Sequence, residues 1–193
     1  MAQQIELFAP GPRALADDAR GSIAYEPGVF GAAESERYLA EILAGAPWTH
    51  ETMWMYDKTV DVPRLVARVR LDEPMLPALA EIKARVEERL GRRFTGLGLN
   101  YYRDGSDSVA WHNDRNEDLI DLPTIALVSL GATRQMLVRP KSPPRKTIAC
   151  DLEPGSLFVM SGRAQEFWEH CIPKTSRPTA ARISIALRQR RVG

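Results

Sequence analysis

The chain has 193 residues, of which 44% are hydrophobic and 26% charged, and its formal net charge is +1. This length allows one substantial hydrophobic core and is short for two. The balanced charge excludes a histone-like polycation but leaves room for a local basic surface. No apolar run approaches the roughly 20 residues of a membrane span, and we expect no export signal at the start of the chain.

The number and spacing of the cysteines indicate the cellular compartment. The two cysteines, Cys150 and Cys171, have no C-x-x-C spacing, which favours reduced thiols over a disulfide framework or a thiolate metal site. We therefore expect a globular, cytoplasmic, monomeric protein with no membrane partner.

The first part of the chain predicts an arm followed by two helices. Residues 1–22 are rich in Ala, Gly, Pro and Asp without periodicity, which indicates a loosely held, flexible arm. A short helix is expected within 32–47, "AAESERYLAEILAGAP", with its apolar side chains on one face. A stronger helix is predicted within 74–91, "PMLPALAEIKARVEERLG", which ends at a capping glycine, Gly91. Its apolar stripe consists of Leu76, Leu79, Ile82, Val86 and Leu90.

After Gly91 the pattern changes to short strands separated by turn residues. Eight strands are predicted, within 94–102, 107–114, 123–131, 134–140, 146–152, 155–162, 166–172 and 181–190. This number and spacing are typical of a sandwich or barrel. Helices followed by strands predict an α+β, mainly β fold, a two-sheet jelly roll with N-terminal supporting helices.

Two histidines and an aspartate are candidates for a metal site. Side chains two residues apart on a strand share a face, so His112 and Asp114 of "WHND" point the same way, and His170 lies in another predicted strand. Two imidazoles and a carboxylate can occupy one face of an octahedral Fe(II) ion and leave three positions open. The alternatives are a hydrogen-bonded His–Asp pair with a core histidine, or a hydrolytic zinc site.

The last predicted strand has an aliphatic face and a cationic face. Arg182, Ser184 and Arg188 alternate with Ile183 and its aliphatic partners in "RISIALR". If the arginines face the interior, an anion is required, because an uncompensated buried charge costs several kcal/mol. A small organic acid suits the planar guanidinium fork. The alternative is a solvated edge strand with a basic tail.

Several ordered motifs resemble a known family. The stretches "LNYYRDGSDSVAWHNDRNE", "IALVSLGATRQMLVRP", "LEPGSLFVMSGRAQEFWEHCIPK" and "RISIALR" are similar to those of the AlkB-type Fe(II)/2-oxoglutarate-dependent dioxygenases. That family repairs alkylated nucleic acids on a double-stranded β-helix, the jelly-roll fold. The resemblance implies a single dioxygenase domain at 23–193, with helices and a substrate-recognition lid at 23–93 and a catalytic β core at 94–190.

The resemblance also implies roles for site residues. His112, Asp114 and His170 would bind Fe(II), Arg182 would hold the distal carboxylate of 2-oxoglutarate, and Arg188 would lie near its metal-bound end. Asn100 and Tyr102 match the family's N-x-Y, which helps to hold this cosubstrate; O₂ is the second cosubstrate. Ser184 stands where most relatives have asparagine, so that one cosubstrate contact differs.

On the substrate side, a methylated base must be flipped out or single-stranded to reach the metal. The candidates for binding it are Trp54, Tyr56 and Arg64, together with Asn116 and Glu117, where relatives often have an acidic residue at the position of Asn116. Phosphate contacts are expected from Arg115, Arg134, Arg139, Lys141, Arg145 and Lys146. Trp111, Gln165 and Trp168 flank the predicted ligands and would orient the imidazoles, although a core role is an alternative for both tryptophans.

The function that follows is oxidative demethylation of N-alkylated bases in DNA or RNA. The reaction would convert 2-oxoglutarate to succinate and release formaldehyde. Two alternatives remain open at this point: an oxygenase acting on another substrate, such as a modified tRNA or a protein, and a catalytically silent nucleic-acid-binding module.

Overall fold

The computed structural model describes residues 11–55, 58–114, 117–177 and 179–191. Within these ranges the helices are α1 (Ala32–Gly45), α2 (Pro77–Leu90) and the short α3 (Ala164–Phe167). The strands are β1 (Arg13–Asp18), β2 (Gly21–Glu26), β3 (Thr49–Met55), β4 (Lys58–Val69), β5 (Gly96–Tyr102), β6 (Val109–His112), β7 (Ile125–Gly131), β8 (Arg134–Pro140), β9 (Ile148–Leu152), β10 (Leu157–Ser161), β11 (Trp168–Ile172) and β12 (Arg182–Arg188).

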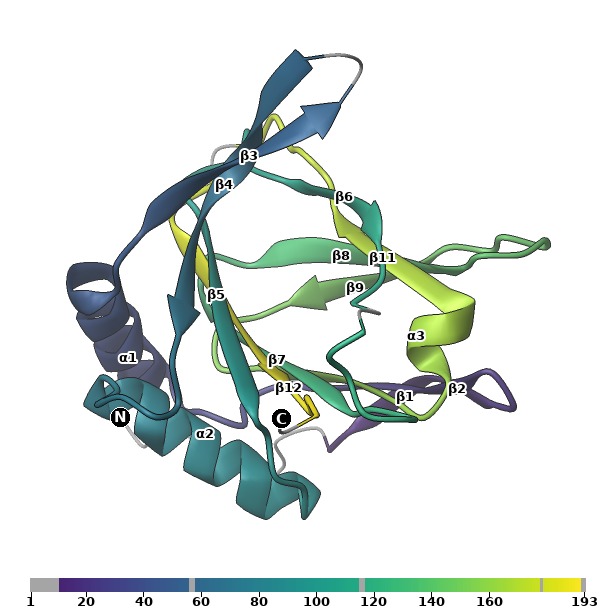
Figure 1. Ribbon diagram of the computed structural model, residues 1–193, viewed down its shortest axis with the longest axis horizontal. Coiled ribbons are helices and arrows are strands. Elements are labelled where there is room, and N and C mark those ends of the chain that lie inside the picture. Colours follow the sequence, from purple (N-terminus) through teal and green to yellow (C-terminus); the bar gives the residue numbers. More distant parts are fainter. Residues whose placement is uncertain (1–10, 56–57, 115–116, 178, 192–193) are drawn as a thin grey trace, which may run out of the picture.

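The strands form two antiparallel sheets, as the sequence predicts (Figure 1). The large sheet has the order β1-β2-β10-β7-β12-β5-β4-β3, and the small sheet has the order β6-β11-β8-β9. The C-terminal strand β12 lies inside the large sheet, paired with β5 on one side and β7 on the other. An edge-strand position for "RISIALR" is therefore wrong.

One hydrophobic core lies between the large sheet and the helices. Ile183, Ile185 and Leu187 of β12 are fully buried there, with Ile42 of α1 and Ile82 of α2. The two predicted helices are confirmed, and α2 ends where expected, because Gly91 adopts the left-handed conformation with a φ of 59°. Figure 1 shows α1 and α2 side by side on the outer side of this sheet.

The second core lies between the two sheets, and it contains the cationic face of β12. Leu127 of β7 and Val138 of β8 belong to this core. Because side chains alternate along a strand, the placement of Ile183 against the helices turns Arg182, Ser184 and Arg188 into the space between the sheets. The condition stated for an anion-binding role, that the arginines face the interior, is therefore met.

The predicted flexible arm requires a correction in its described part. Strands β1 and β2 form a hairpin with Asp18 opposite Gly21, and β2 pairs with β10 in the large sheet. Gly21 has a φ of 107°, which permits the tight turn, and Ile23 and Tyr25 are buried. Their alternation is too short to stand out in the sequence. Residues 1–10 lie outside the described residues, and the division of 23–193 at residue 93 stays a prediction.

Three further elements differ from the expectation. The hairpin of β3 and β4 is not predicted by the sequence pattern; it forms one edge of the large sheet and projects past the other strands in Figure 1. The segment 163–167 contains the turn of α3 before β11. Strand β6 ends at His112, so Asp114 lies outside the strand that its spacing suggests. No helix in the described part of the chain is long and apolar enough to cross a membrane.

The core position of Ile185 gives a stability prediction. Truncation by Ile185→Ala leaves a cavity between the helices and the sheet, so the free energy of unfolding should fall by about 2–5 kcal/mol. Glu36→Ala, on the exposed face of α1, is the control and should stay within about 0.5 kcal/mol of the parent. Urea denaturation measures both, and equal stability of the two variants would contradict this account of the core.

Candidate functional site

The two histidines of the predicted metal site face each other across a pair of strands. His112 at the end of β6 is the direct register partner of His170 on β11. Their ring centroids lie 4.3 Å apart. His112 Nδ1 lies 2.9 Å from the carbonyl oxygen of Ala110, and because a carbonyl only accepts, Nδ1 carries the proton. His112 Nε2 is therefore the nitrogen with a free lone pair.

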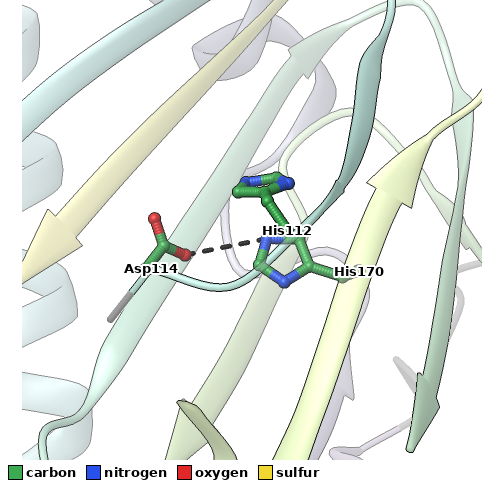
Figure 2. A group of neighbouring side chains, drawn as sticks. All are labelled: His112, Asp114 and His170. Carbon is green, nitrogen blue, oxygen red and sulfur yellow. Dashed lines mark ion pairs between the residues drawn. The ribbon is translucent and has the colours of Figure 1, made fainter. Parts of the chain in front are cut away.

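Asp114 completes a three-residue cluster (Figure 2). Its Oδ2 lies 3.6 Å from His170 Nε2, and candidate ligand atoms of His112, Asp114 and His170 all lie within 4.8 Å of one another. Two imidazoles and one carboxylate on one side of a potential ion match the donor set of non-haem Fe(II) sites with open positions. The residues present therefore fit a divalent cation.

The electrostatics favour the protonation states that a cation needs. Burial lowers the pKa of His170 to about 4, so this imidazole is neutral at pH 7. Burial by itself would raise the pKa of Asp114, but the charge of Arg188 holds it below the usual value. Arg188 donates to Asp114 Oδ1 from Nη2 at 2.6 Å and from Nε at 3.2 Å. A neutral imidazole and an ionised carboxylate are the ligand forms of these side chains.

A second feature of the site is a guanidinium that lacks a counter-ion among the described residues. Arg182 is fully buried, and its Nη2 donates to Ser129 Oγ at 2.9 Å. Its Nε and Nη1 have no hydrogen-bond partner in the described part of the protein, and its guanidinium carbon lies 5.1 Å from the centre of the Tyr102 ring. Burial lowers the pKa of Arg182. An unpaired buried charge costs several kcal/mol, so this site is built for an anion.

The cluster and the guanidinium share one cavity of about 160 Å³. Its wall also includes Asn100 and Ser184, and Arg64 Nε donates to Asn100 Oδ1 at 2.7 Å. The volume is well below the roughly 300–1,000 Å³ of pockets for drug-sized ligands. The cavity therefore suits a small organic acid beside a metal ion.

The structure treats the predicted substrate residues unequally. Arg64 lines the cavity, whereas Glu117 is exposed and borders a separate cleft of about 800 Å³ with Leu119 and Glu166. Trp54 belongs to β3, but its side chain is not among the parts that the structure describes. Tyr56 and Asn116 lie outside the described residues. The substrate roles of all five residues stay predictions.

The contacts described for Trp111, Gln165 and Trp168 involve groups other than the imidazoles, and an orienting role for these residues stays a prediction. The guanidinium of Arg139 stacks on Trp111, and its central carbon lies 3.8 Å from the centre of the Trp111 ring. Trp168 is buried, and its Nε1 has no hydrogen-bond partner among the described residues. Gln165 instead accepts a hydrogen bond from the main-chain N–H of Asp114. The burial of Trp168 fits the alternative of a core role for this residue. Gln165 contacts the main chain of Asp114.

Sequence reasoning also missed one residue and misplaced another. The missed residue is Ser129, which accepts a hydrogen bond from Arg182. The one feature of the sequence that could have indicated this role is that Ser129 is the single polar side chain in the buried stretch "IALVSLG". Arg134, expected at a phosphate, is buried and donates to the carbonyl oxygens of Asp104, Asp107 and Pro173. It ties loops together and is not available to a nucleic acid.

Comparison with known proteins agrees with this geometry. Residues 67–192 match the model of the 2OG-Fe(II) oxygenase superfamily. The chain belongs to this superfamily. It is 32% identical to rat alpha-ketoglutarate-dependent dioxygenase alkB homolog 3 over 84% of this chain and 62% of that protein. The human counterpart is 30% identical over 96% and 76%, and mouse DNA oxidative demethylase ALKBH2 is 32% identical over 61% and 52%.

The chain therefore spans about three fifths of the length of the rat relative, and its similarity to AlkB-type dioxygenases is confirmed. Two solved structures show the fold. A prolyl hydroxylase from Trichoplax adhaerens, in complex with a peptide, has a TM-score of 0.65 at 14% identity and covers 89% of this chain and 84% of its own. A 2OG-Fe(II) oxygenase family oxidoreductase from Burkholderia pseudomallei has a TM-score of 0.60 at 18% identity, with coverage of 89% and 86%. The jelly-roll prediction is thus confirmed.

Removal of one imidazole tests the cluster. His170→Ala should weaken Mn(II) binding, measured by electron paramagnetic resonance of the free ion, by about 100-fold or more, because only two of the three donors remain. His50→Ala is the matched control, since His50 is exposed on β3 and lies outside the cavity. An unchanged affinity in His170→Ala would show that the ion binds elsewhere.

Removal of the guanidinium tests the anion site. Arg182→Met eliminates an unpaired buried charge, so the metal-free protein should resist urea at least as well as the parent. With Mn(II) and 2-oxoglutarate at about 100 times its Kd, the parent should gain about 2.7 kcal/mol of stability from the acid, and the variant should gain none.

Arg92→Met, at an exposed arginine beyond α2, is the control for this experiment and should keep the full gain. A comparable gain from 2-oxoglutarate in Arg182→Met would mean that the acid binds without this residue.

Proposed function

We propose that the chain is an Fe(II)/2-oxoglutarate-dependent dioxygenase that demethylates N-alkylated nucleobases in DNA or RNA. One oxygen atom of O₂ enters succinate as 2-oxoglutarate loses CO₂, and the other hydroxylates the N-methyl group, which then leaves as formaldehyde. The observation that supports this most strongly is the shared cavity: a His–Asp–His cluster and a buried guanidinium that has no anionic partner among the described residues line the same cavity.

In this proposal each lining residue has a task that its contacts support. His112, Asp114 and His170 would hold the iron, and Arg182, supported by Ser129, would hold the distal carboxylate of 2-oxoglutarate. When bound, iron, 2-oxoglutarate and O₂ together supply the oxidising power for hydroxylation of the methyl group.

The other lining residues orient these groups. Arg188 keeps Asp114 ionised and turned toward the cluster. Asn100, whose amide oxygen is occupied by Arg64, is left with its N–H groups to donate to the acid, and Tyr102 and Ser184 complete the wall.

The substrate must enter from outside this cavity, because the space suits the acid and has no room for a nucleotide beside it. A base stacked in a duplex cannot bring its methyl group to the cluster, so a flipped or single-stranded nucleotide is required. The β3–β4 hairpin supports this entry route. It contacts the segment before β6 through a hydrogen bond from Ser108 N–H to the Pro63 carbonyl at 2.8 Å, and the next residue, Arg64, lines the cavity.

Trp54 and Tyr56 of the hairpin segment are proposed to stack on the base, opposite His112. Asn116 and Glu117 would approach its polar edge. Outside the cavity, phosphates would meet the exposed basic side chains of the β8–β9 hairpin, Arg145 and Lys146. Lys141 instead donates to the carbonyl oxygen of Gln165 at 3.0 Å. We further propose that the protein works as a monomer in the cytoplasm. Its two free, buried cysteines support the cytoplasmic location, because disulfides are rare there.

Two other readings fit the site less well. A hydrolytic zinc enzyme would use the cluster but would leave Arg182 buried without an anion. A silent nucleic-acid-binding module would need neither the cluster nor the guanidinium, yet both are present in one cavity. The cosubstrate-dependent oxygenase is the function that uses both groups.

Formaldehyde release tests the proposed substrate. Purified protein with Fe(II), 2-oxoglutarate and single-stranded oligonucleotides, each bearing one N-methylated base, should release formaldehyde and succinate in equal amounts. His170→Ala should reduce turnover by at least about 10³-fold, since all steps need the metal, and His50→Ala should match the parent. Mass spectrometry of the oligonucleotide should show loss of the methyl group.

The alternatives give different results in the same assay. Succinate formed without demethylation of any oligonucleotide in the panel would contradict the nucleic-acid substrate but keep the oxygenase. No Fe(II)-dependent succinate under any condition would contradict the enzyme itself.

A further inference from the structure

Gln165 contacts the segment that carries Asp114 at two points. It lies in α3 and is 3% exposed. Its side-chain Oε1 accepts the main-chain N–H of Asp114 at 2.7 Å, and its own carbonyl oxygen accepts the side-chain amide of Asn113, also at 2.7 Å. A single buried residue thus holds two successive residues of another segment.

Asp114 needs such support because strand pairing does not place it. The β6–β11 ladder sets His112 opposite His170, but β6 ends at His112 and Asp114 lies two residues further on. A ligand beyond the end of a strand has no ladder hydrogen bond to fix its main chain. Its position relative to the imidazoles must come from other contacts.

Arg188 and Gln165 divide this work. Arg188 grips the carboxylate through Oδ1 from the large sheet. A carboxylate held by one oxygen can still pivot when its main chain moves. Gln165 acts on the main chain itself, because it binds the N–H group next to the Cα atom that carries the side chain of Asp114.

The location of Gln165 in the chain links this contact to the third ligand. The turn of α3 leads directly into β11, which carries His170 five residues after Gln165. One short segment therefore delivers an imidazole and also holds the aspartate. In this arrangement Asp114 Oδ2 lies 3.6 Å from His170 Nε2.

We infer that Gln165 is a positioning residue for the metal centre: through Oε1 and through its carbonyl oxygen it holds Asp114 and Asn113 in place, so that the carboxylate meets the two imidazoles. This inference rests on the proposed function, because it assumes that Asp114 binds the ion. A residue that only filled the core would not need a polar side chain here, since burying an amide is costly without hydrogen bonds.

The test compares Gln165→Met with the parent. Methionine has a similar length but cannot accept the Asp114 N–H with useful strength, so Mn(II) affinity should fall by about 10- to 100-fold, the range found when groups that support metal ligands are removed. The resonance spectrum of bound Mn(II) should also change, because the carboxylate has moved. The apparent KM for Fe(II) should rise far more than kcat falls at saturating Fe(II).

Gln135→Met is the matched control, because Gln135 is exposed on β8 and bonds only Asp151 among the contacts described for its side chain. It should leave Mn(II) affinity unchanged. The melting temperature of metal-free Gln165→Met should lie within a few degrees of the parent, which separates positioning from loss of fold.

A second variant keeps the test decisive if Gln165→Met does not fold. Asn113→Ala removes one of the two ties and should lower Mn(II) affinity by a smaller factor, about 3- to 10-fold, as expected for a supporting contact of one hydrogen bond.

The outcomes separate the inference from the function on which it rests. Affinity within twofold of the parent in the folded Gln165→Met protein, or in Asn113→Ala if the first variant is unfolded, would overturn the positioning role alone. Absence of Mn(II) binding by the parent would overturn the metal centre, and with it the proposed function.

Discussion

The buried guanidinium of Arg182 is the constraint on which the functional argument depends. Strand β12 lies inside the large sheet, and its alternation sends isoleucines toward the helices and arginines toward the space between the sheets. A charge placed there without a counter-ion lowers stability by several kcal/mol. A fold keeps such a group when a ligand compensates it, and the cavity beside Arg182 has the size of a small organic acid.

The metal cluster complements this anion site. Strand pairing positions the two histidines, whereas hydrogen bonds from Gln165 and Arg188 position the aspartate. Burial keeps His170 neutral and Arg188 keeps Asp114 ionised, so the cavity presents lone pairs at one end and a positive charge at the other. A bidentate acid that bridges a cation and a guanidinium fits this polarity, and similarity to 2OG-Fe(II) oxygenases agrees with it.

The sequence predicted the fold class and the grouping of the cluster residues, but it did not predict every element and contact around them. Period-two spacing correctly gave β12 one aliphatic and one cationic face, and it grouped His112 with Asp114, although Asp114 lies past the end of its strand. Propensity could not find the β1–β2 hairpin, because two buried residues in six give little periodicity. Nor could it show that Arg134 is buried or that Trp111 packs under Arg139, because those contacts join strands far apart in the chain. Ser129 and the double contact of Gln165 are likewise tertiary features.

A crystal structure of the protein with Mn(II) and 2-oxoglutarate would test the central claim most directly. We predict that the ion binds His112, Asp114 and His170 and that the distal carboxylate of the acid pairs with the free nitrogens of Arg182. An ion bound away from this cluster, or an acid paired with another cation while Arg182 stays without an anion, would contradict the account.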